Sequence, residues 1–178
     1  MSLNIVDGPM FAVKTTHVGM AVSRYIRGGK VAIMIKYAKD ERYRHLSKSG
    51  GVVTHAGYEI PIPTQSVSRL SEVVVPPNCV AIGIDEIQFY PDNVELCDIW
   101  AASGIHIYAA GLGADYNRKP FLRMPELMAH ADTYIKLKAV CECGEDAIYT
   151  KRLTCATELE VIGGDDIYAA KCRKHYQS

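Results

Sequence analysis

Two short segments carry residues whose types and spacing suit phosphate chemistry, and the first is GPMFAVKT, residues 8–15. Gly8, Lys14 and Thr15 match the pattern G-x-x-x-x-G-K-[ST], in which backbone N–H groups hold phosphate, the lysine neutralises charge and the hydroxyl binds Mg²⁺. Val13 stands where the pattern has its second glycine. In a left-handed conformation a β-branched residue costs on the order of 1–2 kcal/mol, which weakens nucleotide binding about tenfold without abolishing it. An ordinary strand–helix turn is the alternative interpretation.

The second segment is IDEIQFYPD, residues 84–92, which contains the adjacent carboxylates Asp85 and Glu86. The pair follows an apolar run of strand length, where buried carboxylates are costly unless they serve a metal or a proton transfer. Phosphoryl transfer can use two carboxylates with different roles. One binds Mg²⁺, and the other accepts the proton of the acceptor hydroxyl. We assign Asp85 to the metal side and Glu86 to the general base. An acidic turn at a strand end is the alternative, and the phosphate loop weighs against it.

A third group of candidate ligands lies in the last forty residues, where Cys141-x-Cys143 precedes Cys172-x-x-His175. Three thiols and one imidazole make the four soft ligands that a closed structural zinc site takes. The single residue between Cys141 and Cys143 makes a zinc knuckle harder to form, so free thiols or a misformed pair are the alternatives. Cys155 is interpreted as a bystander.

Strands that alternate with helices must position these residues. Apolar runs predict strands over residues 3–6, 31–35, 79–85 and 105–110, and periodicity predicts helices over 14–27 and 93–102. Asp92 is the expected N-cap of the second helix. This order predicts an α/β fold with a parallel sheet flanked by helices and a site at the carboxyl edge of the sheet. We interpret the loosely patterned stretch 43–77 as a connection.

Length and charge limit the remaining possibilities. The 178 residues suffice for one catalytic unit, predicted over 1–139, and a small cysteine-containing lobe over 140–178. Lys plus Arg and Asp plus Glu number 20 each, so no global field draws the protein onto nucleic acid or an acidic membrane. No apolar run reaches the roughly 20 residues of a membrane span. We therefore expect a soluble, cytoplasmic protein without membrane or direct nucleic-acid binding.

Several motifs, in one order along nearly the whole chain, closely resemble the type II thymidine kinases of the cytosol and of poxviruses. They are GPMF-x-x-K-[ST], IKYAKDERY (35–43), IGIDEIQFYPD (82–92), NRKPF (117–121), KLKAVC (136–141), YTKRL (149–153) and EVIGGDDIY (160–168). The resemblance implies a P-loop α/β fold with a small zinc-ribbon-like lasso lobe. It also implies transfer of the ATP γ-phosphate, with Mg²⁺, to the 5′-hydroxyl of thymidine or deoxyuridine in pyrimidine salvage.

The resemblance further implies roles for individual residues. It assigns Gly8, Pro9, Met10, Phe11, Ala12, Val13, Lys14 and Thr15 to ATP, Asp85 to the magnesium side, and Glu86 to catalysis. Substrate contacts are implied for Met10, Asp40, Arg42, Gln88, Phe89, Leu112, Tyr116, Phe121, Val161, Ile162, Gly163, Gly164 and Tyr168. For the aromatic and methionine residues, plain core packing is the alternative. Structural zinc on Cys141, Cys143, Cys172 and His175, a homotetramer and feedback inhibition by thymidine triphosphate are implied as well.

Four departures from the family pattern support a second hypothesis. Val13 replaces the phosphate-loop glycine, Ile87 replaces the glycine usual after the acid pair, Gly113 stands where the family has Asp, and the zinc ligands are altered. The second hypothesis is therefore a catalytically degenerate member of the same fold that binds nucleosides or serves as an oligomer partner. The first is an active thymidine kinase with a modified phosphate loop.

Overall fold

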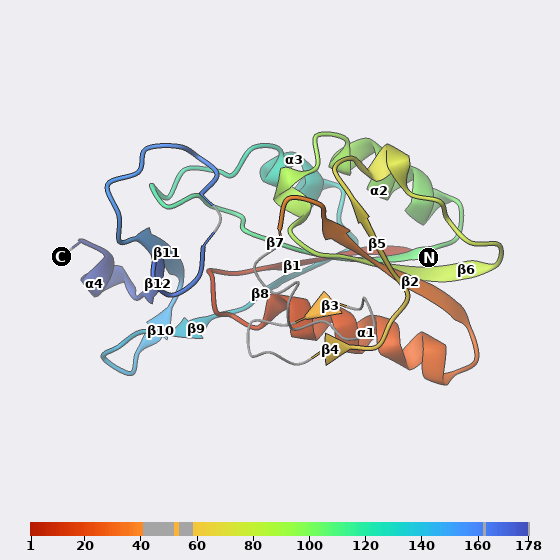
Figure 1. Ribbon diagram of the computed structural model, residues 1–178, viewed down its shortest axis with the longest axis horizontal. Coiled ribbons are helices and arrows are strands. Elements are labelled where there is room, and N and C mark those ends of the chain that lie inside the picture. Colours follow the sequence, from red (N-terminus) through yellow and green to blue (C-terminus); the bar gives the residue numbers. More distant parts are fainter. Residues whose placement is uncertain (41–51, 54–58, 162, 178) are drawn as a thin grey trace.

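The computed structural model describes residues 1–40, 52–53, 59–161 and 163–177 and centres on a six-stranded sheet (Figure 1). Its strands are β1 (Ser2–Asp7), β2 (Val31–Tyr37), β5 (Thr64–Val67), β6 (Cys79–Ile84), β7 (His106–Gly111) and β8 (Thr133–Lys136), in the spatial order β5-β2-β6-β7-β1-β8. Every neighbouring pair is parallel. The predicted parallel α/β fold is confirmed.

Alternating apolar side chains divide the core between the two faces of this sheet. On β2, Ile33 and Ile35 belong to one buried cluster, whereas Ala32 and Met34 belong to another. The first cluster packs against α2 (Asn93–Ala102) and α3 (Met124–Ala129), and the second against α1 (Lys14–Arg27), so helices cover both faces (Figure 1). Strands buried on both faces account for the continuous apolar runs in the sequence.

Beyond the sheet the chain forms short elements. At the C-terminal end β9 (Ala139–Val140) pairs with β10 (Asp146–Ala147), and β11 (Tyr149–Arg152) pairs with β12 (Tyr168–Lys171), both antiparallel. The helix α4 (Arg173–Gln177) follows them (Figure 1). Elsewhere β3 (Val52–Val53) pairs with β4 (Glu59–Ile60), and η2 (Leu70–Glu72) and η3 (Ile87–Phe89) are single 3₁₀ turns. The lobe boundary near residue 140 stays a prediction.

The predicted helices 14–27 and 93–102 have the predicted bounds, and the four predicted strands differ by at most two residues at an end. Asp92 is the N-cap residue of α2, as predicted, but its side chain makes no capping bond there. Its carboxylate instead accepts hydrogen bonds from the backbone N–H groups of Leu70, at 3.0 Å, and Ser71, at 3.0 Å. Burial opposes ionisation of Asp92, but these bonds outweigh it and lower its pKa.

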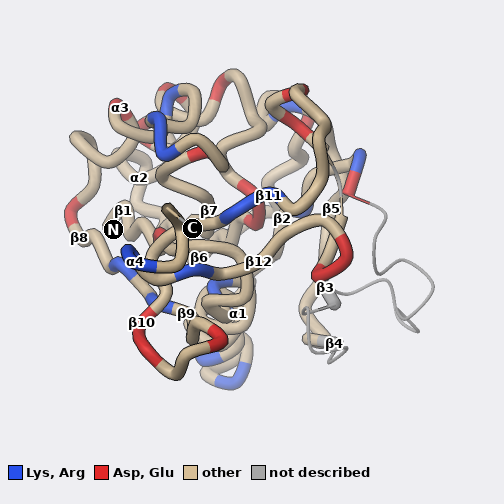
Figure 2. The backbone as a smooth tube through the Cα atoms, turned by 90° about the vertical axis from the view of Figure 1, so that its left-hand side faces the viewer, with Lys and Arg blue, Asp and Glu red and all other residues tan. Residues whose placement is uncertain are grey.

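Lys, Arg, Asp and Glu alternate along the described chain, so neither sign of charge dominates the fold in the view of Figure 2. Among the residues that the structure describes, no helix is long and apolar enough to cross a bilayer.

Candidate functional site

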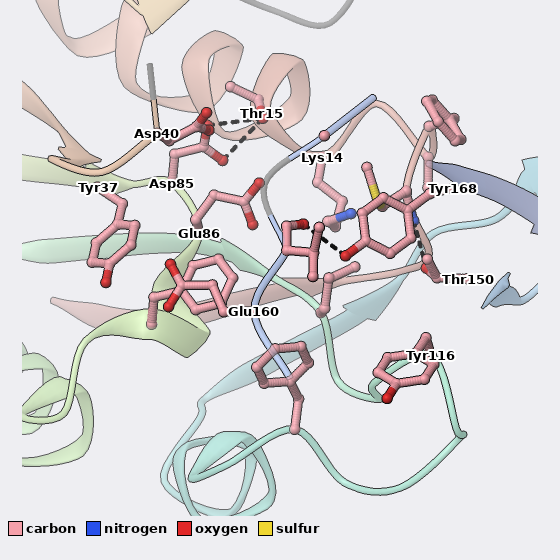
Figure 3. A pocket seen from close by; sticks show the side chains of 18 of the residues that line it. Lys14, Thr15, Tyr37, Asp40, Asp85, Glu86, Tyr116, Thr150, Glu160 and Tyr168 are labelled. Carbon is pink, nitrogen blue, oxygen red and sulfur yellow. Dashed lines mark hydrogen bonds between the residues drawn. The ribbon is translucent and has the colours of Figure 1, made fainter. Parts of the chain in front are cut away.

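A pocket lies where the β1–α1 loop, the carboxyl end of β6 and the segment between β11 and β12 meet (Figure 3). From the predicted site its lining includes residues 10–15, Asp40, Asp85, Glu86, Phe89, Leu112, Tyr116, Phe121, Val161, Gly163 and Tyr168. Gly8, Pro9, Gln88 and Gly164 do not line it. Arg42 and Ile162 lie outside the described residues. Residues far apart in sequence thus meet at the predicted edge of the sheet.

The β1–α1 loop has a left-handed residue at the position where the phosphate-loop pattern has its second glycine. Val13 occupies the N-cap position of α1 in the left-handed conformation, with φ 53° and ψ 27°, and its side chain makes no capping bond. That side chain is 67% exposed. Lys14 follows, and its Nζ donates to the carbonyl of Pro9 at 2.8 Å. The first backbone N–H groups of a helix have no partner within the helix, so the N-terminus of α1 suits an anion.

The acid pair lies directly opposite the start of α1. The hydroxyl of Thr15 donates to the carboxylate of Asp85, with its Oγ1 2.9 Å from Oδ1 and 3.1 Å from Oδ2. Hydroxyl and carboxylate oxygens are the ligands that Mg²⁺ prefers, so this donor set fits the ion. Glu86 follows in a left-handed conformation, with φ 51°, and its side chain enters the pocket (Figure 3).

A hydrogen bond from Gln88 orients the side chain of Glu86. The Gln88 side chain donates from Nε2 to Oε2 of Glu86 at 2.6 Å, and its Oε1 accepts the backbone N–H of Leu112 at 3.1 Å. Gln88 is buried, with 1% of its surface exposed. In this structure Gln88 therefore orients the acid and the Leu112 backbone, and its direct contact with substrate stays a prediction.

Aromatic rings build one wall of the pocket. Phe89 stacks on Tyr37 with a centroid distance of 5.1 Å and meets Phe121 edge to face at 5.6 Å. Phe121 is buried and shares the core cluster with Met124. Phe121 therefore both packs in the core and lines the pocket. A rigid apolar slot of this kind suits a flat ring.

The lasso segment, defined as residues 153–167 between β11 and β12, is tied down by polar contacts to Arg152. The Arg152 guanidinium donates to the carbonyls of Ala156, at 3.0 Å, Leu159, at 3.2 Å, and Glu158. It also donates to the hydroxyl of Tyr168 at 2.9 Å. These charge-assisted hydrogen bonds to three carbonyls fix the path of the loop.

Two tyrosines complete the anchor of the lasso segment. The Arg152 guanidinium carbon lies 3.7 Å from the ring centroid of Tyr116, whose hydroxyl donates to the carbonyl of Thr157 at 3.0 Å. The hydroxyl of Tyr168 donates to the carbonyl of Val161 at 2.7 Å. Tyr116, expected against the base, therefore lines the pocket and supports the lasso segment at the same time.

Seven pocket residues escaped the sequence analysis: Thr16, Ala114 and Leu159, and the four motif residues Tyr37, Thr150, Arg152 and Glu160. The hydroxyl of Thr150 accepts the backbone N–H of Met10 at 3.0 Å and so joins β11 to the phosphate loop. Each of the four lies inside a segment quoted for the family resemblance, IKYAKDERY, YTKRL or EVIGGDDIY. The motifs could have pointed to these four residues. Only the fold shows which side chains of a motif face the pocket.

The predicted zinc ligands do converge. Ligand atoms of Cys141, Cys143, Cys172 and His175 all lie within 4.8 Å of one another. Cys143 Sγ is 3.9 Å from Cys172 Sγ, and His175 Nδ1 is 3.6 Å from Cys141 Sγ and 3.5 Å from Cys172 Sγ. Tetrahedral zinc with ordinary bond lengths implies edges of roughly 3.6 to 3.8 Å. Backbone hydrogen bonds at Cys143 and Cys172 lower the pKa of Cys141 to about 6, which favours a thiolate.

Ile87, one of the departures, does not intrude into the pocket. It is fully buried and belongs to the core cluster. A Cβ atom at Gly111 would lie 2.7 Å from its Cγ2, so Ile87 fills space that the glycine leaves open. This departure is therefore a packing change beneath the acid pair.

Comparisons with known proteins agree with this geometry. The family model described as thymidine kinase matches residues 1–176. The thymidine kinase of Myxoma virus (strain Lausanne) is 39% identical over 176 residues, which cover 98% of this chain and 95% of the relative. The cytosolic thymidine kinase of Homo sapiens is 38% identical over 176 residues, 98% of this chain and 72% of the relative. The thymidine kinase of Vaccinia virus (strain Western Reserve) is 36% identical over 177 residues, 98% of this chain and 96% of the relative.

Proposed function

This chain belongs to the thymidine kinase family, and from that premise we propose that it transfers the γ-phosphate of ATP to the 5′-hydroxyl of thymidine or deoxyuridine in nucleotide salvage. The observation that carries the proposal is the hydrogen bond between Thr15 and Asp85, beside Glu86, in a pocket that joins a phosphate loop to an apolar slot. Donor and acceptor sites thus share one cavity, as direct phosphoryl transfer requires.

At the donor end, backbone N–H groups of residues 8–15 and the N-terminus of α1 hold the triphosphate, and the Lys14 ammonium neutralises it. Thr15 and Asp85 would hold Mg²⁺, which would neutralise charge at the phosphate oxygens. Asp40 lines the same cavity and Arg42 is assigned to the same region by the family motif. Lys14 leaves the Pro9 carbonyl when phosphate replaces that acceptor.

Glu86 acts at the acceptor end. Its carboxylate accepts the proton of the 5′-hydroxyl while the bond from that oxygen to the γ-phosphorus forms and the bond from the γ-phosphorus to the bridging oxygen breaks, releasing ADP. Gln88 holds Glu86 in place through the 2.6 Å hydrogen bond. The left-handed backbone of Glu86 aims its side chain away from the core and into the pocket.

The apolar slot takes the base. Phe89 and Phe121 supply the aromatic wall, with Met10 and Leu112 in the same lining. Backbone groups of residues 161–164 read the base edge, and Tyr168 closes the slot. Fixed amides suit a flat ring with fixed donors and acceptors.

Cys141, Cys143, Cys172 and His175, together called the Cys/His cluster, would hold a structural Zn²⁺, which would link the two ends of the lobe. The thiol-rich donor set and short ligand separations support zinc over Mg²⁺. By analogy with the family, the protein assembles as a homotetramer, responds to thymidine triphosphate as a feedback inhibitor, and works in the cytoplasm. The alternative, a degenerate binding module, loses support because Lys14, Thr15, Asp85 and Glu86 are all present in one pocket.

Replacement of the general base tests the function. Purified protein is assayed with Mg-ATP and thymidine beside Glu86→Gln, and thymidine affinity is measured by calorimetry. We expect turnover by the parent, a loss of at least about a hundredfold in kcat for the variant, and binding within about threefold of the parent. Retained turnover in Glu86→Gln would refute the base assignment. Binding without turnover by the parent would favour the degenerate module.

A further inference from the structure

Tyr176, near the C-terminal end of the chain, connects the Cys/His cluster to the wall of the pocket. Its hydroxyl donates to the backbone carbonyl of Tyr116, a residue that lines the pocket. Its backbone N–H donates to the carbonyl of Cys172 at 3.0 Å, and His175 directly precedes it in the sequence. Tyr176 is thus hydrogen-bonded to one predicted zinc ligand, adjacent to a second, and hydrogen-bonded to the pocket wall.

The ring of Tyr176 is held by its neighbours. Its centroid lies 5.2 Å from that of Tyr149 on β11, and the guanidinium carbon of Arg118 lies 4.7 Å from it. Helix α4, which carries Tyr176, packs against β11 and β12 (Figure 1). Aromatic and cation–π contacts of this kind hold a ring without using its hydroxyl. The place of the hydroxyl therefore depends on the place of α4.

The loop that accepts this hydrogen bond is a compact turn. The backbone N–H of Asp115 donates to the carbonyl of Lys119 at 2.8 Å. The buried carboxylate of Asp115 accepts the backbone N–H groups of Asn117 and Lys119, each at 2.8 Å. A turn closed by its own aspartate in this way has little freedom to deform. A shift of the Tyr116 carbonyl therefore moves the ring of Tyr116 as well.

The side chain of Tyr116 in turn contacts the lasso segment. Its hydroxyl donates to the carbonyl of Thr157 at 3.0 Å, and the Arg152 guanidinium lies over its ring. The same segment supplies residues 159–161 to the lining of the pocket. A continuous series of contacts therefore runs from the Cys/His cluster through Tyr176 and Tyr116 to the lasso segment.

On the basis of the proposed function, we infer that Tyr176 is a positioning residue that couples metal occupancy of the Cys/His cluster to nucleoside binding. Cys172 and His175, when they hold zinc, fix α4 and so place the Tyr176 hydroxyl. That hydroxyl places Tyr116, and Tyr116 supports the lasso segment. Coupling between two binding events is reciprocal, so a nucleoside in the pocket must raise the zinc affinity of the cluster by the same factor.

The first experiment measures this reciprocal effect without turnover. A competing chromophoric chelator reports the zinc affinity of the parent, Tyr176→Phe and Tyr149→Phe, each with and without thymidine. Tyr149→Phe is the matched control, because it removes a hydroxyl from the same ring cluster, and that hydroxyl has no hydrogen bond in the described part of the chain. We expect thymidine to raise zinc affinity at least about threefold in the parent and the control, and less than about 1.5-fold in Tyr176→Phe.

Calorimetry and steady-state kinetics give the second readout. For zinc-loaded Tyr176→Phe we expect the Kd and KM for thymidine to rise at least about threefold, while kcat and the KM for ATP stay within about twofold of the parent. Zinc removal should weaken thymidine binding by the parent more than by Tyr176→Phe, because the variant has already lost the hydrogen bond that transmits the effect.

A purely structural role for Tyr176 would lower zinc affinity equally with and without thymidine, and that result would overturn the inference. An equal effect of Tyr149→Phe would also overturn it, as would a parent that binds thymidine but holds no zinc. In each of these cases the kinase function stands. Failure of the parent to bind or phosphorylate thymidine would instead overturn the proposed function, and this inference with it.

Discussion

The carboxylate of Asp7 occupies the space that a side chain at Gly113 would need. A Cβ atom on Gly113 would lie 2.8 Å from both oxygens of Asp7, and the Gly113 N–H donates to one of them at 2.7 Å. Asp7 is buried and also accepts the hydroxyl of Tyr134 at 2.6 Å, with Lys136 Nζ 3.5 Å away. Asp7 therefore leaves room only for glycine at position 113. This departure from the family pattern has a structural reason, so it gives less support to the hypothesis of a catalytically degenerate protein.

We therefore predict that Gly113→Ala destabilises the protein by about 1–3 kcal/mol through overpacking, and that Gly113→Asp costs more because it adds a charge beside Asp7. Urea unfolding measures both. Asp7→Ala combined with Gly113→Ala should cost less than the sum of the single variants. Simple additivity would show that the two positions do not compete for space.

Val13→Gly tests the strained phosphate loop. A left-handed φ of 53° is unfavourable for valine and open to glycine, so the glycine variant should bind ATP up to about tenfold more tightly. Steady-state KM for ATP and calorimetric affinity measure the change. Val13→Ala is the matched control, because alanine removes the branch but keeps the Cβ, and it should recover only part. Unchanged affinity in Val13→Gly would show that the loop is not strained in the ATP complex.

Arg152→Met tests the anchor of the lasso segment. Loss of the guanidinium leaves three carbonyls without their donor, so the loop should loosen and KM for thymidine should rise at least about tenfold. KM for ATP should stay within about twofold. Faster amide exchange in residues 156–161 is the independent readout. Lys151→Met, one position earlier on β11, controls for the loss of charge, and an equal effect there would contradict the specific role of Arg152.

Zinc removal tests the Cys/His cluster. We expect about one zinc ion per chain by elemental analysis, and a lower thermal midpoint after treatment with a strong chelator. His175→Ala should lose most of the metal, whereas His175→Cys should retain it because a thiolate can replace the imidazole. Parent protein that is purified with zinc present and still carries none would refute the site.

Acid titration tests the ion pairs of Arg123. Its guanidinium contacts Glu95 at 2.7 Å and Glu126 at 2.8 Å, and its hydrogen bonds lower the pKa of Glu95 from 4.5 to about 2. A lowered pKa stabilises the folded state above pH 4.5, and that contribution is lost as pH falls toward 2. The thermal midpoint of Glu95→Gln should therefore lie below the parent's at pH 7, by less than about 4 °C because the pair is exposed. The gap should close near pH 2, and a constant gap would contradict the ion-pair origin.

The strong local signals made most of the sheet and the site predictable. Continuous apolar runs marked β2 and β6, and helical periodicity marked α1 over its full length. β5 and β8 are four residues each and polar at several positions, so their pairing depends on neighbours that no local pattern reveals. The N-cap position of Asp92 was predictable, but the partners of its carboxylate were not, because the amides of Leu70 and Ser71 are distant in sequence.

Within the site, roles that depend on direction were the hardest to predict. Arg152 lies in a strand whose alternation allows either face, and Glu160 is one acid among several in an acidic segment. Only the path of the lasso segment shows that both side chains enter the pocket. Lys14 and Glu86 were recognised from motifs, so predicting their roles did not require the direction of their side chains.

The strand β11 reaches both halves of the reaction site with two residues of the same parity. Thr150 bonds the β1–α1 loop, and Arg152 bonds the lasso segment. Side chains two residues apart lie on the same face of a strand. A shift of β11 by one residue against β12 would therefore turn Thr150 and Arg152 away from the pocket and turn Tyr149 and Lys151 toward it. The register of the four residues of β11 on β12 therefore fixes the β1–α1 loop and the lasso segment together, and we expect an insertion or deletion in β11 to displace both.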